Sequence, residues 1–222
     1  MTYVFPPFTD KVTLLGGGEL TQATVSQMLT LAPNLVAADG AAHWAIEMGL
    51  PLARVIGDMD SLSAPDRAAL PAAIIQEIRE QDSTDFDKAL RSIDAPMILG
   101  VGFMGRRLDH ELAAFSSLVR QADRKCILVG EHDICFHVPE KLEIHLTPGT
   151  RFSLFPMAGL TAHARGLKWP VDNMNMSPWG RVGTSNEVVS PRVTLRFDRP
   201  GMLVILARSA LKPAIRALES AV

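Results

Sequence analysis

The sequence predicts an α/β protein in which an N-terminal doubly wound, mainly parallel α/β (Rossmann-like) domain is followed by a C-terminal antiparallel β-sandwich. Up to about residue 130, short β-like apolar runs alternate with helical patterns, which is typical of βαβ units. After Gly130 the helical pattern stops, and short β-rich runs separated by Pro and Gly turns follow, as in antiparallel sandwiches or barrels. We place the boundary near Asp133, which gives domains over 1–133 and 134–222.

The elements of the first domain are predicted from apolar runs and helix-start residues. Pro65 favours a helix start, because proline suits the first helical turn. Phe86, Leu90 and Ile93 share one face of a predicted helix. We expect strands at 12–15, 35–38, 54–56, 73–78, 97–101 and 125–129. Helices are expected at about 21–31, 41–48, from 65, 84–93 and 108–122.

The second domain is predicted to consist of short strands joined by turns at 148–149, 178–180 and 200–201. The expected strands are 134–138, 142–146, 151–155, 160–164, 187–189, 193–197 and 202–206. A short helix over 211–222 is expected to end the chain.

Composition limits the class of protein. Of the 222 residues, 47% are apolar and 21% are charged, as in globular proteins with a core. The net charge of −2 argues against non-specific nucleic-acid binding, which needs a basic surface. No apolar run approaches the roughly 18 residues of a membrane span, and the N-terminus lacks signal-peptide features, so we expect a cytoplasmic protein. Cys126 and Cys135 lie in apolar strand-like runs, which favours reduced core thiols.

Two acidic stretches are the strongest functional signal. Asp58 and Asp60 follow a predicted strand, and residues two apart in an extended chain point the same way. Both carboxylates can therefore face the region beyond the strand end, where ligands bind in open α/β sheets. Adjacent like charges are costly without a cation, and oxygen ligands suit a hard ion such as Mg²⁺. Asp82 and Asp85 add carboxylates at the start of a predicted helix.

Each acidic stretch also has a purely structural interpretation. Asp58 and Asp60 could form Asx turns, and Thr84 followed by Asp87 fits a helix capping box. The combination is more informative, because five aspartates lie in two loops separated by a single strand–helix unit. It favours a Mg²⁺-polyphosphate site.

The glycines at 16–18 follow the first strand and can bring backbone amides close to a phosphate at a helix start. In the pattern G-x-G-x-x-G the last position is Thr21 rather than glycine, so the dinucleotide fingerprint is incomplete. Asp39 ends the second strand, about where a ribose-binding acid lies in dinucleotide-binding folds. An NAD site is therefore a minor alternative, and a plain tight turn is the structural one.

Residues 102–110 combine glycines with two arginines at a helix start. The guanidinium fork suits phosphate oxygens, and two positive charges at the positive end of a helix are unfavourable without an anion. Arg106 and Arg107 therefore favour a phosphate contact. In the structural alternative, Asp109 pairs with an arginine and His110 caps the helix.

In the second domain, Trp169 and Trp179 offer flat faces to a heteroaromatic ring. Ser185 and Asn186 offer a compact donor–acceptor pair of the kind that binds a ring edge. Taken singly, each of these residues is more simply explained as part of a core or a turn.

Together these motifs resemble the thiamine pyrophosphokinase family. The resemblance spans roughly residues 12–206 and rests on Asp39-Gly40, Gly57-Asp-Met-Asp-Ser61, Asp82-Ser-Thr-Asp-Phe-Asp87, Gly102 with Arg107-Leu-Asp-His110, Gly166-Leu-Lys-Trp-Pro170 and Ser185-Asn-Glu187. It implies a catalytic α/β domain and a C-terminal sandwich that binds thiamine. It also implies a homodimer in which the catalytic domain of one subunit meets the sandwich of the other. The implied reaction converts thiamine and ATP to thiamine diphosphate and AMP.

The chain departs from the family pattern near the nucleotide. Ala41 and His43 stand where the family usually has a glycine and an asparagine, and Arg106 replaces a glycine. These differences concern nucleotide binding rather than the reaction class.

The resemblance, read with the residues, gives a hypothesis for the site. The expected metal ligands are Asp58, Asp60 and Asp85, with Asp82 assisting. Arg107 and Lys88 are expected to stabilise the transferred diphosphate, whereas Asp39 and Asp109 orient the nucleotide, a metal-bound water or the hydroxyl. The nucleotide-binding set also includes Gly17, Gly18, Gly40, Gly102 and His110, and the thiamine-binding set is Trp169, Ser185 and Asn186.

Two other functions fit the same motifs. One is a related Mg²⁺-dependent diphosphokinase acting on another heterocyclic alcohol, such as a pterin. The other is a non-catalytic sensor of thiamine or nucleotide, which the clustered carboxylates argue against.

Overall fold

The structure is a computed structural model that describes residues 5–221. It divides into two compact units, one ending at Ser117 and the other beginning at Leu118, and each is described by itself. The domain boundary near Asp133 stays a prediction. Among the residues described, no helix is long and apolar enough to cross a membrane.

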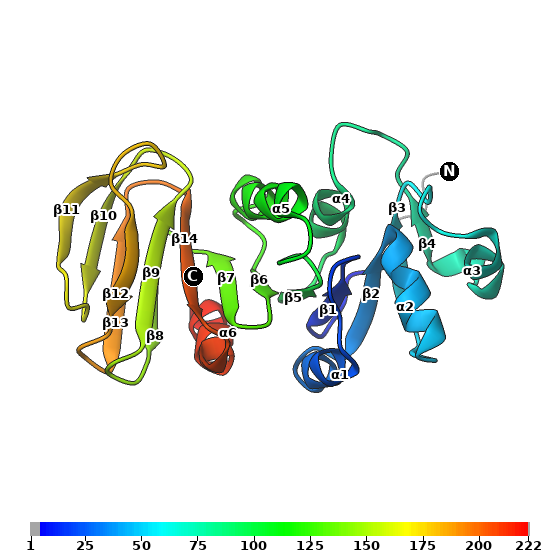
Figure 1. The fold of residues 1–222 in the computed structure, drawn as a ribbon, viewed down its shortest axis with the longest axis horizontal. Helices are drawn as coiled ribbons and strands as arrows, with labels where there is room; N and C mark the ends of the chain where they lie inside the picture. Colours follow the sequence, from blue (N-terminus) through cyan, green and yellow to red (C-terminus); the bar gives the residue numbers. More distant parts are fainter. Residues whose placement is uncertain (1–4, 222) are drawn as a thin grey trace. The chain divides into compact units, whose positions relative to one another are not determined.

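The first unit contains a fully parallel sheet with the strand order β5-β1-β2-β3-β4. Its strands are β1 (Val12–Leu15), β2 (Asn34–Ala38), β3 (Arg54–Gly57), β4 (Ile75–Glu77) and β5 (Ile98–Val101). The helical elements are α1 (Gln22–Leu31), η1 (Asp39–Ala41), α2 (Ala42–Glu47), α3 (Ala64–Ala69), η2 (Ala72–Ile74), α4 (Asp85–Ser92) and α5 (Leu108–Arg120). In Figure 1, α1 and α4 lie on opposite sides of this sheet. The predicted mainly parallel α/β fold is confirmed.

The strand order places a topological switch point beside β1. From β1 the chain proceeds outward through β2, β3 and β4, and then returns to lay β5 against the other edge of β1. In open α/β sheets, a crevice forms at the carboxyl ends of strands where the order reverses in this way. The fold therefore predicts a ligand site near Leu15 and Val101, the last residues of the two strands.

The helices of the first unit begin where capping residues occur in the sequence. The hydroxyls of Thr21, Ser63 and Thr84 accept hydrogen bonds from backbone amides three residues later, which satisfies donors that the helix leaves free. Phe86 and Leu90 on the apolar face of α4 are buried, and the helix packs on β3 and β2. This packing fixes the rotation of α4 about its axis, and therefore which of its side chains face the sheet.

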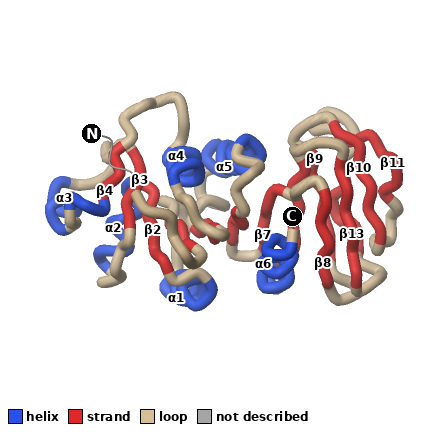
Figure 2. The backbone as a smooth tube through the Cα atoms, turned by 180° about the vertical axis from the view of Figure 1, so that it is seen from behind, coloured by secondary structure: helices blue, strands red, loops and turns tan. Residues whose placement is uncertain are grey.

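The strands of the second unit pair in an antiparallel manner and form two groups. Figure 2 shows these strands in red. One has the order β12-β9-β14-β7-β6, with β6 (Cys126–Val129), β7 (Asp133–His137), β9 (Arg151–Pro156), β12 (Gly183–Glu187) and β14 (Met202–Ala207). The other has the order β11-β10-β13-β8, with β8 (Lys141–His145), β10 (Leu160–Arg165), β11 (Val171–Met176) and β13 (Arg192–Phe197). The chain continues into η3 (Arg208–Ala210) and α6 (Leu211–Ser220). In β8, β10 and β13 buried and more exposed residues alternate, so one face of that sheet is the core face. The predicted antiparallel C-terminal region is confirmed.

Two strands of this unit differ from the sequence-based expectation. The segment Val171–Met176, where no strand was expected, forms β11 because it pairs along β10, with a register shift between Ala162 and Ala164. Its asparagines have low strand propensity, so tertiary pairing overrides the local preference. The strand expected at 187–189 is instead Gly183–Glu187, and Val188 forms only an isolated bridge with Leu167.

The central strand is expected to be the part of the first unit most sensitive to cavities. Leu14 on β1 is 0% exposed, whereas Met48 after α2 is 43% exposed. Leu14→Ala should lower the free energy of unfolding by about 2–5 kcal/mol, and Met48→Ala should change it by less than about 0.5 kcal/mol. Urea denaturation followed by circular dichroism measures both. Equal effects of the two substitutions would contradict the assignment of β1 to the core.

Candidate active site

A cavity of about 480 Å³ lies at the carboxyl end of the parallel sheet in the first unit. It is lined by the loops that follow β1, β2, β3 and β5 and by the start of α4. The predicted site residues that line it are Gly17, Gly18, Asp39, Gly40, Asp58, Asp60, Asp85, Lys88, Gly102, Arg107 and His110. Asp82 and Asp109 are not among its lining residues. The cavity is therefore where the strand order predicts a ligand site.

The loops after β1 and β5 meet through glycines. The amide of Gly18 donates to the carbonyl oxygen of Gly102 at 2.9 Å, and that of Gly16 donates to Val101 at 2.8 Å. A Cβ on Gly16 or Gly18 would lie 2.6 Å from the Gly102 oxygen, so neither position can carry a side chain without movement. These glycines therefore allow the two loops to approach each other, and the predicted contact of their backbone with phosphate stays a prediction.

Three carboxylates converge on one point of the cavity. Oxygens of Asp39, Asp58 and Asp60 all lie within 4.8 Å of one another, and this group could hold a metal ion. Asp85, which the sequence hypothesis placed among the ligands, is outside this group, and Asp39 takes the third place. A sequence signal for Asp39 existed, because it also follows directly on a strand end.

Asp39 is held in an unusual conformation. It is 2% exposed, and its φ of 42° lies in the left-handed region. Its Oδ2 accepts a hydrogen bond from the Ser61 amide at 3.1 Å, whereas Oδ1 is buried without a hydrogen-bond partner among the residues described. Gly57 makes this possible, since a Cβ there would lie 2.6 Å from the Asp39 Cβ. A buried carboxylate oxygen without a donor is suited to a cation.

The loop after β3 directs the other two carboxylates. Met59 has a φ of 67°, which turns the chain sharply between Asp58 and Asp60. The Asp60 amide donates to Oδ1 of Asp58 at 3.3 Å, and the Ser61 hydroxyl donates to Oδ1 of Asp60 at 2.9 Å. These local bonds orient both acids. The two carboxylates converge as expected, but through a turn at Met59 and not through the extended chain that the two-residue spacing assumed.

Lys88 supplies the positive charge inside this acidic group. Its side chain is 1% exposed, and Nζ lies 2.7 Å from Oδ2 of Asp58 and 3.3 Å from Oδ1 of Asp85. Because α4 carries both Asp85 and Lys88 one turn apart, the helix brings the ammonium back toward the strand ends. Lys88 was expected to contact diphosphate, and in the structure its first partners are these two carboxylates.

The pKa shifts follow from this arrangement. Burial raises the pKa of Asp39, and the neighbouring Asp85 raises it further. Burial also raises the pKa of Asp85, although Lys88 opposes the shift. The hydrogen bond from Lys88 lowers the pKa of Asp58. Burial lowers the pKa of Lys88, but its bonds to Asp58 and Asp85 outweigh burial and leave it raised. One cation therefore stabilises Asp58 while excess negative charge remains around Asp39.

A polar network that the sequence did not reveal fixes the loop before α4. Arg91 lies 2.6 Å from Glu80, 3.1 Å from Asp87 and 3.0 Å from the Ser83 hydroxyl. Hydrogen bonds from Ser83 and Arg91 lower the pKa of Glu80 to about 2. Asp82 lies within this loop, where its amide donates to Glu80 at 2.8 Å. The only sequence signal was the four-residue spacing of Asp87 and Arg91 on one helix.

The two arginines at 106 and 107 behave differently. Arg107 forms an exposed ion pair with Asp109 at 2.7 Å, as in the structural alternative. Arg106 has a φ of 34°, and its guanidinium donates to the carbonyl oxygen of Gly17 at 3.4 Å across the crevice. The residue that replaces the family's glycine therefore lines the cavity.

The predicted thiamine-binding residues lie together in the second unit. Oδ1 of Asn186 accepts from the Trp169 amide at 3.1 Å, and Nδ2 donates to the Trp169 carbonyl oxygen at 2.8 Å. Asn186 is buried, whereas the Trp169 side chain is 54% exposed. Ser185, with a φ of 60°, donates its amide to the Ser153 hydroxyl and keeps its own side chain exposed. The amide of Asn186 thus holds the backbone that presents Trp169.

Comparison with known proteins gives one consistent family. Residues 25–129 match the family model described as "Thiamin pyrophosphokinase, catalytic domain", and residues 133–202 match "Thiamin pyrophosphokinase, vitamin B1 binding domain". Thiamine pyrophosphokinase 1 of Oryza sativa subsp. japonica is 32% identical over 161 residues, covering 64% of this chain and 61% of that protein. The thiamine pyrophosphokinase of Bacillus subtilis is 26% identical over 176 residues, covering 72% of this chain and 80% of that protein.

Solved structures show the same fold. A protein from Lactobacillus plantarum superposes with a TM-score of 0.76 at 24% identity, covering 90% of this chain and 99% of that chain. Thiamine pyrophosphokinase from Bacillus subtilis superposes with a TM-score of 0.70 at 22% identity, covering 89% and 98%. The match spans about three fifths of the length of the plant relatives, 61% for the rice protein and 60% for one from Arabidopsis thaliana.

The buried charge of Asp39 predicts a stability gain when it is removed. Because burial raises its pKa in the folded state, its contribution lowers stability as the pH rises above about 3.9, the usual value for aspartate. Asp39→Asn, which tolerates the same φ, should therefore raise the melting temperature at pH 7 in the presence of a chelator. It should also reduce the further rise that Mg²⁺ produces in the wild type.

Differential scanning calorimetry between pH 4 and pH 8 measures both effects, with Asp123→Asn as an exposed control for the lost charge. A variant that is less stable than the wild type at pH 7 without metal would contradict the assignment.

Proposed function

Because the chain belongs to the thiamin pyrophosphokinase family, we propose that it transfers the diphosphate group of ATP to the hydroxyethyl group of thiamine, giving thiamine diphosphate and AMP. The observation that carries the proposal is the convergence of three carboxylates beside a glycine-walled crevice at the switch point of the parallel sheet. Diphosphoryl transfer depends on positioning and charge neutralisation more than on covalent help from the protein. A crevice with clustered carboxylates suits those two tasks.

Asp39, Asp58 and Asp60 are the proposed ligands of Mg²⁺. In an octahedral shell with Mg–O distances of about 2.0–2.1 Å, neighbouring oxygens lie about 2.9 Å apart and opposite ones about 4.2 Å apart. The three carboxylates, whose oxygens lie within 4.8 Å of one another, would move closer together around one ion. The unpartnered Oδ1 of Asp39 supplies one oxygen without loss of an existing hydrogen bond. When bound, the ion would neutralise phosphate charge and stabilise the leaving AMP.

The crevice residues are proposed to hold the phosphates. The backbone of Gly17, Gly18 and Gly102 allows a phosphate chain to approach closely, because no side chain intervenes. Arg106 reaches across the crevice and can donate to phosphate oxygens with the rest of its guanidinium. Arg107 is proposed to leave Asp109 for the transferred diphosphate, since an exposed pair of this kind is weak.

Lys88 and Asp85 are proposed to act next to the transferred group. Lys88 stabilises the charged form of Asp58, and its ammonium can donate a further hydrogen bond to a β-phosphate oxygen. Asp85 has a raised pKa and lines the cavity, which suits a carboxylate that accepts the proton of the thiamine hydroxyl. Asp82, outside the cavity lining, is proposed to assist only by shaping the loop.

Thiamine binding is proposed to use Trp169 and Ser185. The exposed face of Trp169 suits stacking on a thiamine ring, and the Ser185 hydroxyl suits a polar ring edge. Asn186 uses Oδ1 and one Nδ2 hydrogen in hydrogen bonds to the Trp169 backbone, so its proposed role is to position the tryptophan.

A homodimer is proposed on the basis of the family resemblance. Leu108 and Leu112 lie one turn apart on α5 and are 70% and 55% exposed, which is unusual for leucines on a monomer surface. In the dimer the catalytic unit of one subunit would complete its site with the thiamine-binding unit of its partner. Analytical ultracentrifugation at micromolar concentration should give twice the 24.1 kDa mass of the chain, and a monomer would count against this arrangement.

The reaction is tested by incubating the purified chain with ATP, Mg²⁺ and thiamine and separating the products by chromatography. AMP and thiamine diphosphate should form in equal amounts, and a chelator should abolish both. Formation of ADP and thiamine monophosphate would contradict attack at the β-phosphorus. A pterin alcohol used in place of thiamine as acceptor would show the related diphosphokinase, and thiamine binding without any product would show a sensor.

The metal ligands predict a separation of catalysis from folding. Because Asp60 is a proposed metal ligand, Asp60→Asn should lower kcat at least about a hundredfold. Because its side chain is exposed, the melting temperature without metal should stay nearly unchanged. The control Asp123→Asn should keep wild-type kcat. Steady-state assays and thermal melts report the two quantities, and loss of folding in Asp60→Asn would show that this acid is structural.

A further inference from the structure

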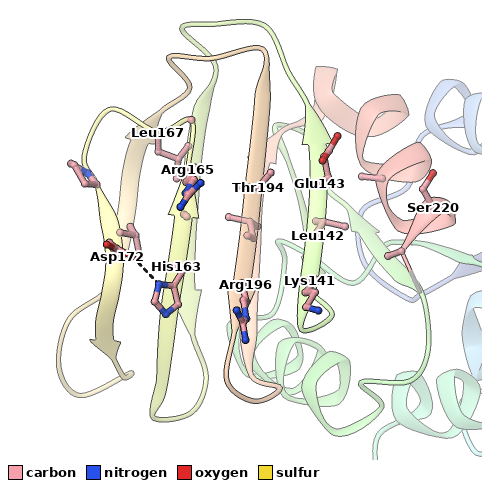
Figure 3. Close-up of a pocket in the computed structure, with 17 residues that line it drawn as sticks. Lys141, Leu142, Glu143, His163, Arg165, Leu167, Asp172, Thr194, Arg196 and Ser220 are labelled. Carbon is pink, nitrogen blue, oxygen red and sulfur yellow. Dashed lines mark hydrogen bonds and ion pairs between the residues drawn. The ribbon is translucent and has the colours of Figure 1, made fainter.

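The outer face of the sheet β11-β10-β13-β8 carries a row of cationic side chains. The strand register sets His163 of β10 directly opposite Arg196 of β13, and Arg196 directly opposite Lys141 of β8. Arg165 lies two residues beyond His163 and therefore on the same face of β10. Figure 3 shows these side chains along the three neighbouring strands.

Such a row is unfavourable by itself. Residues directly opposite in an antiparallel pair have Cβ atoms about 4.5–5.5 Å apart, and like charges in such pairs destabilise the sheet. Lys141, Arg165 and Arg196 form no ion pair with a carboxylate within residues 5–221. The sheet thus carries an uncompensated cluster of positive charge.

The acids on the same face are already engaged elsewhere. Glu143 lies 2.5 Å from a guanidinium nitrogen of Arg192 and 3.1 Å from Nε2 of His145. Asp172 of β11 lies 2.9 Å from Nδ1 of His163, the contact drawn dashed in Figure 3. The remaining charges of this sheet face are paired, which sets the three unpaired cations apart from an ordinary mixed surface.

The three cations line a cavity rather than a flat surface. Its volume is about 850 Å³, within the roughly 300–1,000 Å³ usual for small-molecule sites. Leu167 and Pro170 contribute apolar lining where the chain crosses between β10 and β11, and the last turn of α6 contributes Ala217 and Ser220. Glu143 and Asp172 also line it, so the three cations leave a small net positive charge in a concave and partly apolar cavity.

We propose that this cavity binds a small polyanion that carries two or more phosphate groups, held by Lys141, Arg165 and Arg196. Guanidinium groups bind phosphate oxygens in a bidentate manner, and two of them flanked by an ammonium match a di- or triphosphate chain. Thr194 lies directly opposite Arg165 and Glu143 in the register and adds a neutral hydroxyl donor between the charges. None of these residues belongs to the sets assigned to diphosphoryl transfer.

A small ligand fits better than a nucleic acid. The net charge of the chain is −2, so there is no broad basic surface to attract a phosphate backbone. On this sheet face the three unpaired cations lie along the lining of one cavity, whose walls limit the size of the occupant. A compact polyphosphate is therefore the occupant that the charge and the shape favour.

The test is a titration of the full chain with inorganic tripolyphosphate in the presence of a chelator, followed by backbone amide chemical shifts. Shifts should saturate and should centre on β8, β10 and β13. The readout needs no turnover, so a failure here is distinct from a failure of the proposed reaction. Repeating the titration with ATP and with AMP separates a nucleotide from inorganic polyphosphate, because AMP lacks the phosphate chain and should bind at least about tenfold more weakly.

Charge-reversal variants make the test specific. Arg196→Glu and Arg165→Glu should each weaken tripolyphosphate binding at least about tenfold, and the milder Arg196→Gln should weaken it in the same direction. Lys212→Glu on the exposed side of α6 is the matched control and should change the affinity less than about twofold. The amide spectra also show that each variant is folded.

Three results would overturn the proposal. The first is a set of shifts that rises without saturation, as simple screening would produce. The second is binding that maps only to the first-unit cavity or survives in both glutamate variants. The third is binding of heparin, a polymeric polyanion, without binding of tripolyphosphate.

Discussion

The buried ion pair between Lys88 and Asp58 is the interaction on which the acidic edge of the sheet depends. Four carboxylates meet there, and without an internal cation their mutual repulsion would oppose folding. Lys88 satisfies Asp58 and Asp85 at 2.7 and 3.3 Å, yet a single ammonium cannot neutralise Asp39 and Asp60 as well. Removing one partner of a buried ion pair is destabilising, because the other charge is left without a partner. The contact therefore matters both for the stability of the fold and for the geometry of the site. The remaining negative charge is what the proposed divalent ion would neutralise.

Glycines shape the backbone at the same edge of the sheet. Since β5 returns to lie against β1, the loops that follow these strands meet at the switch point, and glycines at 16, 18 and 102 let them approach. Gly57 plays the matching part beneath Asp39, where a side chain would push the carboxylate away. The site therefore combines loops of exposed backbone with a group of carboxylates. Both parts depend on glycines at strand ends.

The sequence was most informative where local chemistry determines structure. Parallel strands, capped helices and the strand-end aspartates follow from apolar runs, capping hydroxyls and the spacing of Asp58 and Asp60, and the structure has all of them. It was least informative where distant segments meet. The grouping of Asp39 with Asp58, the hold of Asn186 on Trp169 and the strand at Val171–Met176 all require tertiary contacts. The roles of the individual residues in catalysis and binding stay predictions.

The most direct test of the metal site is a titration of Mn²⁺, as a paramagnetic substitute for Mg²⁺, followed by the electron paramagnetic resonance signal of the free ion. We expect saturable binding to the wild-type chain, which a non-hydrolysable ATP analogue tightens and which Asp58→Asn largely abolishes. Matched Mn²⁺ binding in the wild type and in Asp58→Asn, with no effect of the analogue, would contradict the claim that this sheet edge is a metal–nucleotide site.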